Sequence, residues 1–136
     1  MVIYFAGSIR GGRDDRGIYA AIIELLRDYG KVVTDHVGDA NISLGGEDAP
    51  DREIHDRDIK WLRSSDVLVA EVTTPSLGVG YEIGRSVEWG KRIICLYRRM
   101  DGRKLSGMIA AAPGVEVHEY SAVPELRAVF DRTLKS

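Results

Sequence analysis

The sequence predicts a three-layer α/β domain of the Rossmann or flavodoxin-like kind, with a five-stranded parallel sheet between two layers of helices. Short apolar runs alternate with stretches that have the period of an α-helix, a pattern typical of parallel sheets. The chain has 136 residues, which suits a single domain over residues 1–136. Loops rich in Gly and Ser follow two of the apolar runs, where strands of such folds lead into helices.

In the first half of the chain, two strands alternate with two helices. The run Val2–Ala6 is apolar and predicts the first strand. Apolar residues recur with a helical period from Ile18 to Tyr29 and predict a helix, which Gly30 is expected to end. A short second strand, a polar and Gly-rich loop that could act as a lid, and a helix with apolar residues on one side are expected at residues 31–34, 37–50 and 51–64.

In the second half, three strands alternate with three helices. The run Asp66–Val72 is almost wholly apolar, as buried parallel strands are. Gly90 is expected to end the helix that follows this strand. The remaining strands are expected at residues 92–97 and 115–120, and the helices at 79–89, 105–112 and 123–134. This succession predicts the strand order 2-1-3-4-5, with the topological switch point between the first and third strands.

Composition and charge argue against several classes of function. The hydrophobic content of 44% and charged content of 29% are typical of soluble globular proteins. The net charge of −2 argues against a nucleic-acid polymer as partner, because such partners usually require a basic face. No apolar run reaches the roughly 18–20 residues of a membrane span, and the N-terminus does not resemble a signal peptide. We therefore expect a cytoplasmic protein with no membrane partner.

The cysteine and histidines predict neither a metal site nor a bound cofactor. Cys95 lies within an apolar run and is expected to be a buried structural thiol. His36, His55 and His118 each lack a nearby Cys or His partner in the sequence, which makes each a poor metal ligand candidate.

Both Gly-rich loops fall at the expected switch point. Gly7–Arg13 follows the first strand, and Thr73–Glu82 follows the third. Glycines allow the backbone to approach a phosphate closely, and Ser8 and Arg10 offer a hydroxyl and a fork-shaped cation. The first loop matches neither the dinucleotide fingerprint nor the P-loop. Considered alone, it is equally well a solvated turn.

Glu82, Asp58 and Tyr4 are the candidates for chemistry. Glu82 lies near the start of its helix, where an acidic residue also favours the helix dipole in any protein. Asp58 shares a helix face with apolar residues and needs a partner there, while Arg57 beside it is expected to be a solvated charge. Tyr4 is either a core residue or a hydroxyl that reaches the pocket, and Tyr81 could form a pocket wall.

These stretches resemble the nucleoside 2-deoxyribosyltransferase superfamily and, within it, the 2′-deoxynucleoside 5′-monophosphate N-glycosidases. The resemblance extends over nearly the whole chain and is more specific than any single motif. It is carried by Tyr4–Arg13, Tyr29–Val37, Asp58–Leu62, Val69–Thr73, Pro75–Arg85 and Leu105–Ile109.

The resemblance implies roles for individual residues. Glu82 would attack the anomeric carbon, Asp58 would assist the leaving base or position water, and Tyr4 would orient Glu82. The two acids would raise each other's pKa, which favours a protonated Asp58. Ser106 would reach the phosphate bound by the neighbouring subunit of a homodimer. The implied substrate-binding residues are Ser8, Ile9, Arg10, Gly11, His36, Ser76, Gly78, Ser106 and Met108.

The expected function is hydrolysis of the N-glycosidic bond of nucleoside 5′-monophosphates through a covalent intermediate on Glu82. A transferase that exchanges bases between deoxynucleosides would use the same carboxylate, but a free 5′-hydroxyl gives no reason for Arg10 beside Ser8. A non-catalytic nucleotide sensor and a flavodoxin-like electron carrier also stay open, because a fold does not fix a function. The sequence leaves the base preference and the choice between ribose and deoxyribose undecided.

Overall fold

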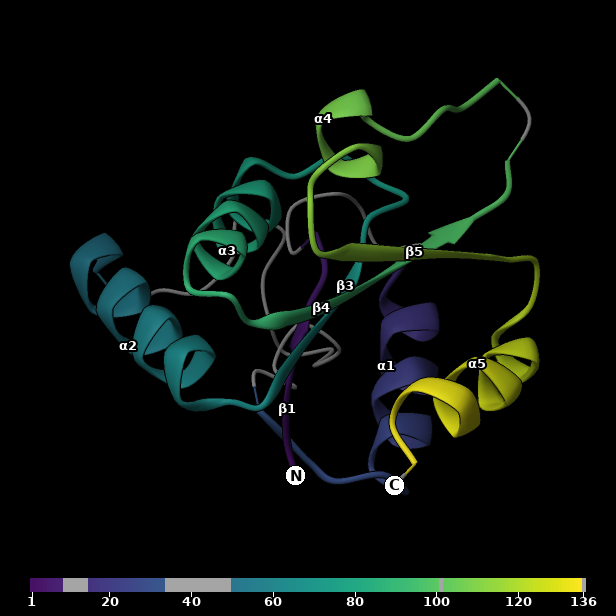
Figure 1. Ribbon diagram of the computed structural model, residues 1–136, viewed down its shortest axis with the longest axis horizontal. Helices are drawn as coiled ribbons and strands as arrows, with labels where there is room; N and C mark the ends of the chain where they lie inside the picture. The colour runs from purple at the N-terminus through teal and green to yellow at the C-terminus, as the bar shows by residue number, and fades with distance from the viewer. Residues whose placement is uncertain (9–14, 34–49, 101, 136) are drawn as a thin grey trace.

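A five-stranded parallel sheet lies between two layers of helices in the computed structural model, which describes residues 1–8, 15–33, 50–100 and 102–135 (Figure 1). The strand order is β2-β1-β3-β4-β5, as predicted. The strands are β1 Val2–Ala6, β2 Lys31–Val33, β3 Val67–Glu71, β4 Arg92–Arg98 and β5 Val115–Tyr120. The helices are α1 Arg16–Leu26, α2 Asp51–Ser64, α3 Leu77–Glu88, α4 Gly107–Ala110, the 3₁₀ turn η3 Val123–Glu125 and α5 Leu126–Thr133. The predicted loop over residues 37–50 lies almost wholly outside the described residues.

Alternating side chains along the strands produce two cores, one on each face of the sheet. Ile3 and Phe5 of β1 pack with α1 and α5 on one face. Tyr4 and Ala6 point to the other face, where α2 and α3 cover the sheet. Cys95 is fully buried in this second core, as predicted, and burial raises the pKa of its thiol to about 12. A thiol in such surroundings is a packing group rather than a nucleophile.

The end of α3 follows the prediction. Gly90 has a φ of 69°, which favours glycine. Its N–H donates to the carbonyl oxygen of Val87 at 3.1 Å, and the N–H of Lys91 donates to that of Ser86 at 3.0 Å. This pair of bonds is a Schellman motif, which ends the helix.

The prediction that Gly30 ends the first helix was wrong. α1 ends at Leu26, and turns occupy the residues between its end and Gly30. A Cβ atom at position 30 would lie 2.4 Å from the carbonyl oxygen of Met1. Glycine is needed there because the start of the chain passes directly over it on the way into β1.

The carboxyl ends of β1 and β3 lie next to each other, since Ala6 pairs with Ala70 in parallel register. Ser8 therefore lies near the segment that begins at Val72 and leads into α3. Both Gly-rich loops start at this edge of the sheet, as the strand order predicts. In the part of the chain that the structure describes, no helix has the length and apolar character needed to cross a membrane.

Candidate active site

A cavity of about 540 Å³ opens at the carboxyl ends of β1 and β3. Its walls come from the loop after β1, from the side of α2 and from the first half of α3. Its polar lining includes Ser8, His55, Asp58, Ser76, Tyr81 and Glu82. The cavity therefore gathers the carboxylates of Asp58 and Glu82 and two serine hydroxyls from segments far apart in the sequence, and Asp51 at the start of α2 also lines it.

Glu82 is held in this cavity by Tyr4. The Tyr4 hydroxyl donates a hydrogen bond to Oε2 of Glu82, and the tyrosine is 2% exposed. Glu82 lies in the second turn of α3, which carries no acidic residue in its first turn. The helix dipole acts mainly on the first turn, so it does not account for this carboxyl. Tyr4 is thus a buried core residue whose hydroxyl reaches the Glu82 carboxyl at the cavity wall.

Burial raises the pKa of Glu82 from its ordinary value of 4.5 to about 7. The hydrogen bond from Tyr4 lowers this pKa, and the charge of Asp58 raises it. Glu82 is thus close to its midpoint of ionisation at neutral pH. Burial also raises the pKa of Tyr4, with Glu82 adding to the effect, so the tyrosine remains a neutral donor.

Asp58 faces the cavity from α2 and forms an ion pair with its neighbour. Two guanidinium nitrogens of Arg57, Nε and Nη2, each lie 3.0 Å from Oδ1 of Asp58. Arg57 also lies over the Trp61 ring, at 4.9 Å from its centroid. The prediction that Arg57 is an ordinary solvated charge was wrong, because its side chain is 31% exposed and fixes the second carboxylate. A protonated Asp58 stays a prediction.

The other end of the cavity has the features of an anion site. Ser8 is 4% exposed. Ser76 caps α3, because its Oγ accepts a hydrogen bond from the N–H of Val79 at 3.3 Å. Gly78 follows in the first turn, and the nearest described atom to a Cβ placed there is Oγ of Ser76 at 3.8 Å. A helix N-terminus with small residues and a hydroxyl is suited to bind a phosphate.

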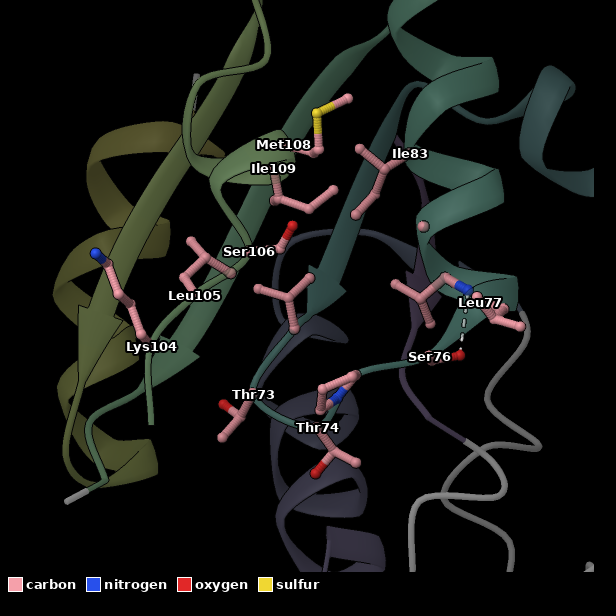
Figure 2. A pocket seen from close by; sticks show the side chains of 14 residues that line it. Thr73, Thr74, Ser76, Leu77, Ile83, Lys104, Leu105, Ser106, Met108 and Ile109 are labelled. Carbon is pink, nitrogen blue, oxygen red and sulfur yellow. Dashed lines mark hydrogen bonds between the residues drawn. The ribbon is translucent and has the colours of Figure 1, made fainter. Parts of the chain in front are cut away.

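A second cavity of about 460 Å³ adjoins the first and shares the wall Pro75–Leu77 with it (Figure 2). Ser106 and Met108 line this second cavity and are absent from the lining of the first. Both are exposed, Met108 to 83%. The structure thus brings together the two carboxylates, Ser8, Ser76 and Gly78, and places Ser106 and Met108 next to that group. Ile9, Arg10, Gly11 and His36 lie outside the described residues.

His55 is a cavity residue that the sequence reasoning considered only as a metal ligand. Its Nε2 lies 2.9 Å from the hydroxyl of Tyr81, and their ring centroids are 5.7 Å apart. Arg85 also donates to that hydroxyl, at 2.5 Å. His55 precedes Asp58 by three residues in α2, which puts both on one helix face and was the available signal. Among the described residues, no three His, Cys, Asp or Glu side chains form a potential metal site.

Comparisons with known proteins point to one family. The family model described as nucleoside 2-deoxyribosyltransferase matches residues 3–123. A mouse protein named 5-hydroxymethyl-dUMP N-hydrolase is 58% identical over 112 residues, which cover 81% of this chain and 65% of the mouse protein. A rat protein of the same name is 53% identical over 135 residues, covering 96% of this chain and 82% of the rat protein.

A solved structure shares the fold at much lower identity. The structure of a CMP N-glycosidase from Clostridium botulinum superposes with a TM-score of 0.69 and 19% identity. The match covers 98% of this chain and 100% of the other. This likeness shows that the three-layer arrangement is common to both proteins.

Proposed function

Because this chain belongs to the nucleoside 2-deoxyribosyltransferase family, we propose that it is an N-glycosidase of 2′-deoxynucleoside 5′-monophosphates. The reaction releases the free base and deoxyribose 5-phosphate. The names of the mouse and rat relatives, which cite a deoxynucleotide and hydrolysis, support the proposal. The observation that carries it is the Glu82 carboxyl, held by Tyr4 in a cavity that also contains Asp58.

In the first step, a Glu82 carboxylate oxygen forms a bond to the anomeric carbon while the bond from that carbon to the base breaks. The electron pair of the broken bond goes to the base nitrogen, and a proton from Asp58 neutralises the leaving base. Positive charge that builds on the sugar is stabilised by the carboxylate and then trapped as an ester. Tyr4 positions the attacking carboxylate, because its hydroxyl donates a hydrogen bond to Oε2 of Glu82.

In the second step, water attacks the anomeric carbon and the ester bond to Glu82 breaks. The ionised Asp58 takes a proton from this water, which restores both carboxyl groups to their starting states. In this mechanism the base leaves past Asp58 and water enters by the same path. The wall of His55 and Tyr81 lies beside that path, and we assign it to contact with the base.

The 5′-phosphate is assigned to the serine end of the cavity. The Ser8 and Ser76 hydroxyls and the N-terminus of α3 at Gly78 supply donors for its oxygens, and Arg10 supplies a positive charge. Binding energy from this group, which does not react, holds the sugar in position for attack. A free nucleoside would forgo this energy, which favours the nucleotide hydrolase over the transferase.

The remaining assignments extend the same proposal. Ile9, Gly11 and His36 contact the nucleotide. The protein acts as a cytoplasmic homodimer in which Ser106 of one subunit completes the site of the other, and Met108 contacts the base or the sugar. The position of these two residues in an adjoining cavity, instead of the cavity that Glu82 lines, supports a shared site.

Base release from 5-hydroxymethyl-dUMP, dCMP, GMP and deoxycytidine tests the proposal. We expect release from the deoxynucleotides, with a loss of at least about 10³-fold in Glu82→Ala because the nucleophile is gone. Glu88→Ala, an exposed change at the end of the same helix, is the matched control and should keep full activity. Mass spectrometry of rapidly quenched enzyme should find the sugar phosphate on Glu82.

Other outcomes would identify a different function. Release from deoxycytidine in preference to dCMP, together with base exchange, would establish the transferase. Tight nucleotide binding with no release, unchanged in Glu82→Ala, would establish a sensor. Release that persists in Glu82→Ala would overturn the covalent mechanism while leaving the hydrolase activity in place.

A further inference from the structure

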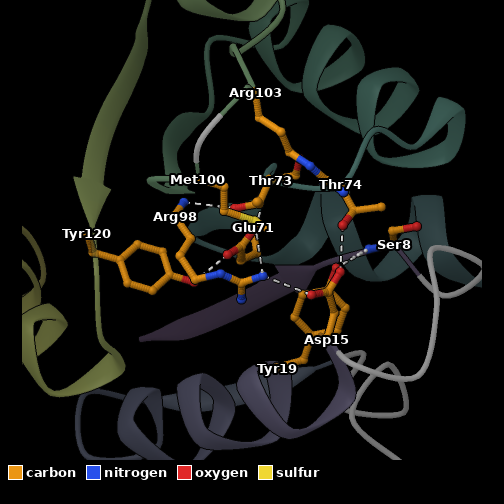
Figure 3. A network of polar contacts seen from close by, with 10 residues as sticks. All are labelled: Ser8, Asp15, Tyr19, Glu71, Thr73, Thr74, Arg98, Met100, Arg103 and Tyr120. Atoms are coloured by element: carbon orange, nitrogen blue, oxygen red, sulfur yellow. Dashed lines mark hydrogen bonds and ion pairs between the residues drawn. The ribbon is translucent and has the colours of Figure 1, made fainter.

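A buried polar network joins the two loops of the candidate phosphate site to the start of α1 (Figure 3). It lies at the carboxyl ends of the central strands and on the sheet face opposite α2 and α3. Its central group is the carboxylate of Asp15, which is 7% exposed. Neither the proposed mechanism nor the sequence reasoning assigned a role to this residue.

Asp15 occupies the N-cap position of α1, yet its carboxylate does not cap that helix. Aspartate at such a position usually accepts hydrogen bonds from amides of the first turn. Here Oδ2 accepts from the hydroxyl of Thr74 at 2.5 Å, and Oδ1 accepts from Nη2 of Arg98 at 3.1 Å. These partners lie 59 and 83 residues away in the sequence. The carboxylate thus forms tertiary contacts with β4 and with the loop before α3.

The same loop is held at the preceding residue. The N–H of Thr73 donates to Oε1 of Glu71 at 2.7 Å, and its hydroxyl oxygen accepts from the N–H of Arg98 at 2.8 Å. Thr73 is 4% exposed and Glu71 is 1% exposed. Two successive threonines are therefore fixed in place, and Ser76 follows only two residues after Thr74.

The first loop is held by the same face of α1. Tyr19 lies four residues after Asp15, which places both side chains on one side of the helix. The N–H of Ser8 donates to the Tyr19 hydroxyl at 3.1 Å. The ring also lies against Gly7, where a Cβ atom would approach it to 3.0 Å. α1 thus contacts the start of one loop through Tyr19 and the other loop through Asp15.

We propose that Asp15 is a positioning residue for the phosphate site, which holds the Thr73–Ser76 loop in register with Ser8 through its bonds to Thr74 and Arg98. The inference rests on the proposed function, because it assigns the phosphate of the substrate to these two loops. The hydroxyls of Ser8 and Ser76 must both reach the same phosphate group, so a small shift of either loop weakens phosphate binding. Glu82 has its own support from Tyr4 and should not shift with the loop.

Thr74→Val is the principal test, because it removes the hydroxyl and leaves the ion pair of Asp15 with Arg98 in place. We expect KM for dCMP to rise about tenfold, as the loss of one hydrogen bond to a charged group implies, while kcat changes less than about twofold. Thr74→Ser restores the hydroxyl and should restore KM. Asp15→Asn offers one acceptor oxygen in place of two and should change KM in the same direction as Thr74→Val.

Asp28→Asn is the matched control. Asp28 lies just beyond the other end of α1 and forms an exposed ion pair with Arg127 at 2.8 Å, which this substitution breaks. It should leave KM unchanged. Titration of each variant with deoxyribose 5-phosphate should show a weaker Kd for Thr74→Val that matches the change in KM. A thermal melt of each variant separates a loss of fold from a loss of binding.

Three outcomes would overturn the positioning role. They are an unchanged KM and Kd in Thr74→Val, a failure of Thr74→Ser to restore them, and a loss confined to kcat with a lowered melting temperature, which marks a purely structural residue. If the wild type releases no base, the proposed function fails. The Kd for deoxyribose 5-phosphate then still decides whether Asp15 positions a phosphate site.

Discussion

At the scale of single residues, the site depends on one hydrogen bond between the Tyr4 hydroxyl and the Glu82 carboxyl. The two residues are 78 positions apart, so no sequence period reveals their contact. Tyr4, Asp58 and Glu82 were candidates from their positions in the sequence, where each also had an ordinary structural explanation. Their individual roles were implied only by the resemblance to a known family. The pairing of Arg57 with Asp58 was missed, since adjacent residues of a helix do not usually face each other.

The pKa of Glu82 predicts how activity depends on pH. The Glu82 carboxyl must be ionised to attack, so kcat/KM should rise with pH through a midpoint near 7. Because Asp58 must hold a proton for the leaving base, kcat/KM should fall again at higher pH, where Asp58 has lost that proton. The bond from Tyr4 stabilises the charged form and lowers this pKa. Tyr4→Phe should therefore move the midpoint upward, by about one pH unit if the bond contributes roughly 1.5 kcal/mol to the carboxylate.

The measurement is the pH profile of kcat/KM for dCMP in both proteins, because the same substrate cancels the titration of its own phosphate. Tyr29→Phe is the control, since the Tyr29 hydroxyl bonds to Asp131 away from the site. A midpoint that does not move in Tyr4→Phe would show that another group limits the reaction at low pH.

At the scale of elements, the sequence located the strands better than the helix ends. β1 and β5 match their predicted ranges, and in β1 a continuous run of apolar residues defines the strand directly. α3 begins at Leu77, two residues before its predicted start, because Ser76 caps the helix through its side chain. The closing helix divides into η3 and α5 near Pro124, a detail of backbone hydrogen bonding that side-chain periodicity does not contain.

Gly78 in the first turn of α3 provides a test that separates binding from folding. Its Cβ would meet Ser76 Oγ only at an ordinary contact distance of 3.8 Å, so the protein itself tolerates alanine there. Gly78→Ala should stabilise the fold by about 0.5–1 kcal/mol, as alanine does in helices. It should nevertheless raise KM for dCMP severalfold, because the methyl group occupies space beside the Ser76 hydroxyl.

Gly84→Ala on the same helix is the matched control. Position 84 is exposed, with no described atom outside its own helix neighbourhood within 4 Å of the added Cβ. It should stabilise the fold to a similar degree and leave KM unchanged. Equal KM values for Gly78→Ala and the wild type would remove Gly78 from the phosphate site.

At the scale of the whole molecule, the strand order 2-1-3-4-5 determines where the site forms. The switch point between β1 and β3 brings their following loops together, and this could be predicted from connectivity. The network of Asp15, Thr74 and Arg98 could not be predicted, because each side chain alone is an ordinary polar residue and the contacts span 59 and 83 positions. The second cavity likewise forms only when α4 and the residues before it lie across from α3 and the loop after β3.

The proposed homodimer predicts complementation between inactive variants. If Ser106 acts in the neighbouring site, a heterodimer of Glu82→Ala and Ser106→Ala contains one intact site and one doubly altered site. Mixing the two proteins with subunit exchange should then restore activity to about one quarter of the wild-type value, as random pairing in a two-fold dimer requires. Activity equal to the sum of the separate variants would show that each subunit uses its own Ser106.

The burial of Glu82 also has a consequence for the stability of the fold. In the unfolded chain this carboxyl has its ordinary pKa of 4.5, whereas in the folded protein the pKa is about 7. Between these two pH values the folded state holds a proton that the unfolded state has released, so unfolding becomes easier as pH rises from 4.5 to 7. Above pH 7 the ionised carboxyl lowers the free energy of unfolding by up to roughly 3 kcal/mol. The carboxylate that makes the cavity reactive thus makes the free protein less stable at the pH values where it can attack. Formation of the ester with the substrate removes this buried charge and its destabilising effect.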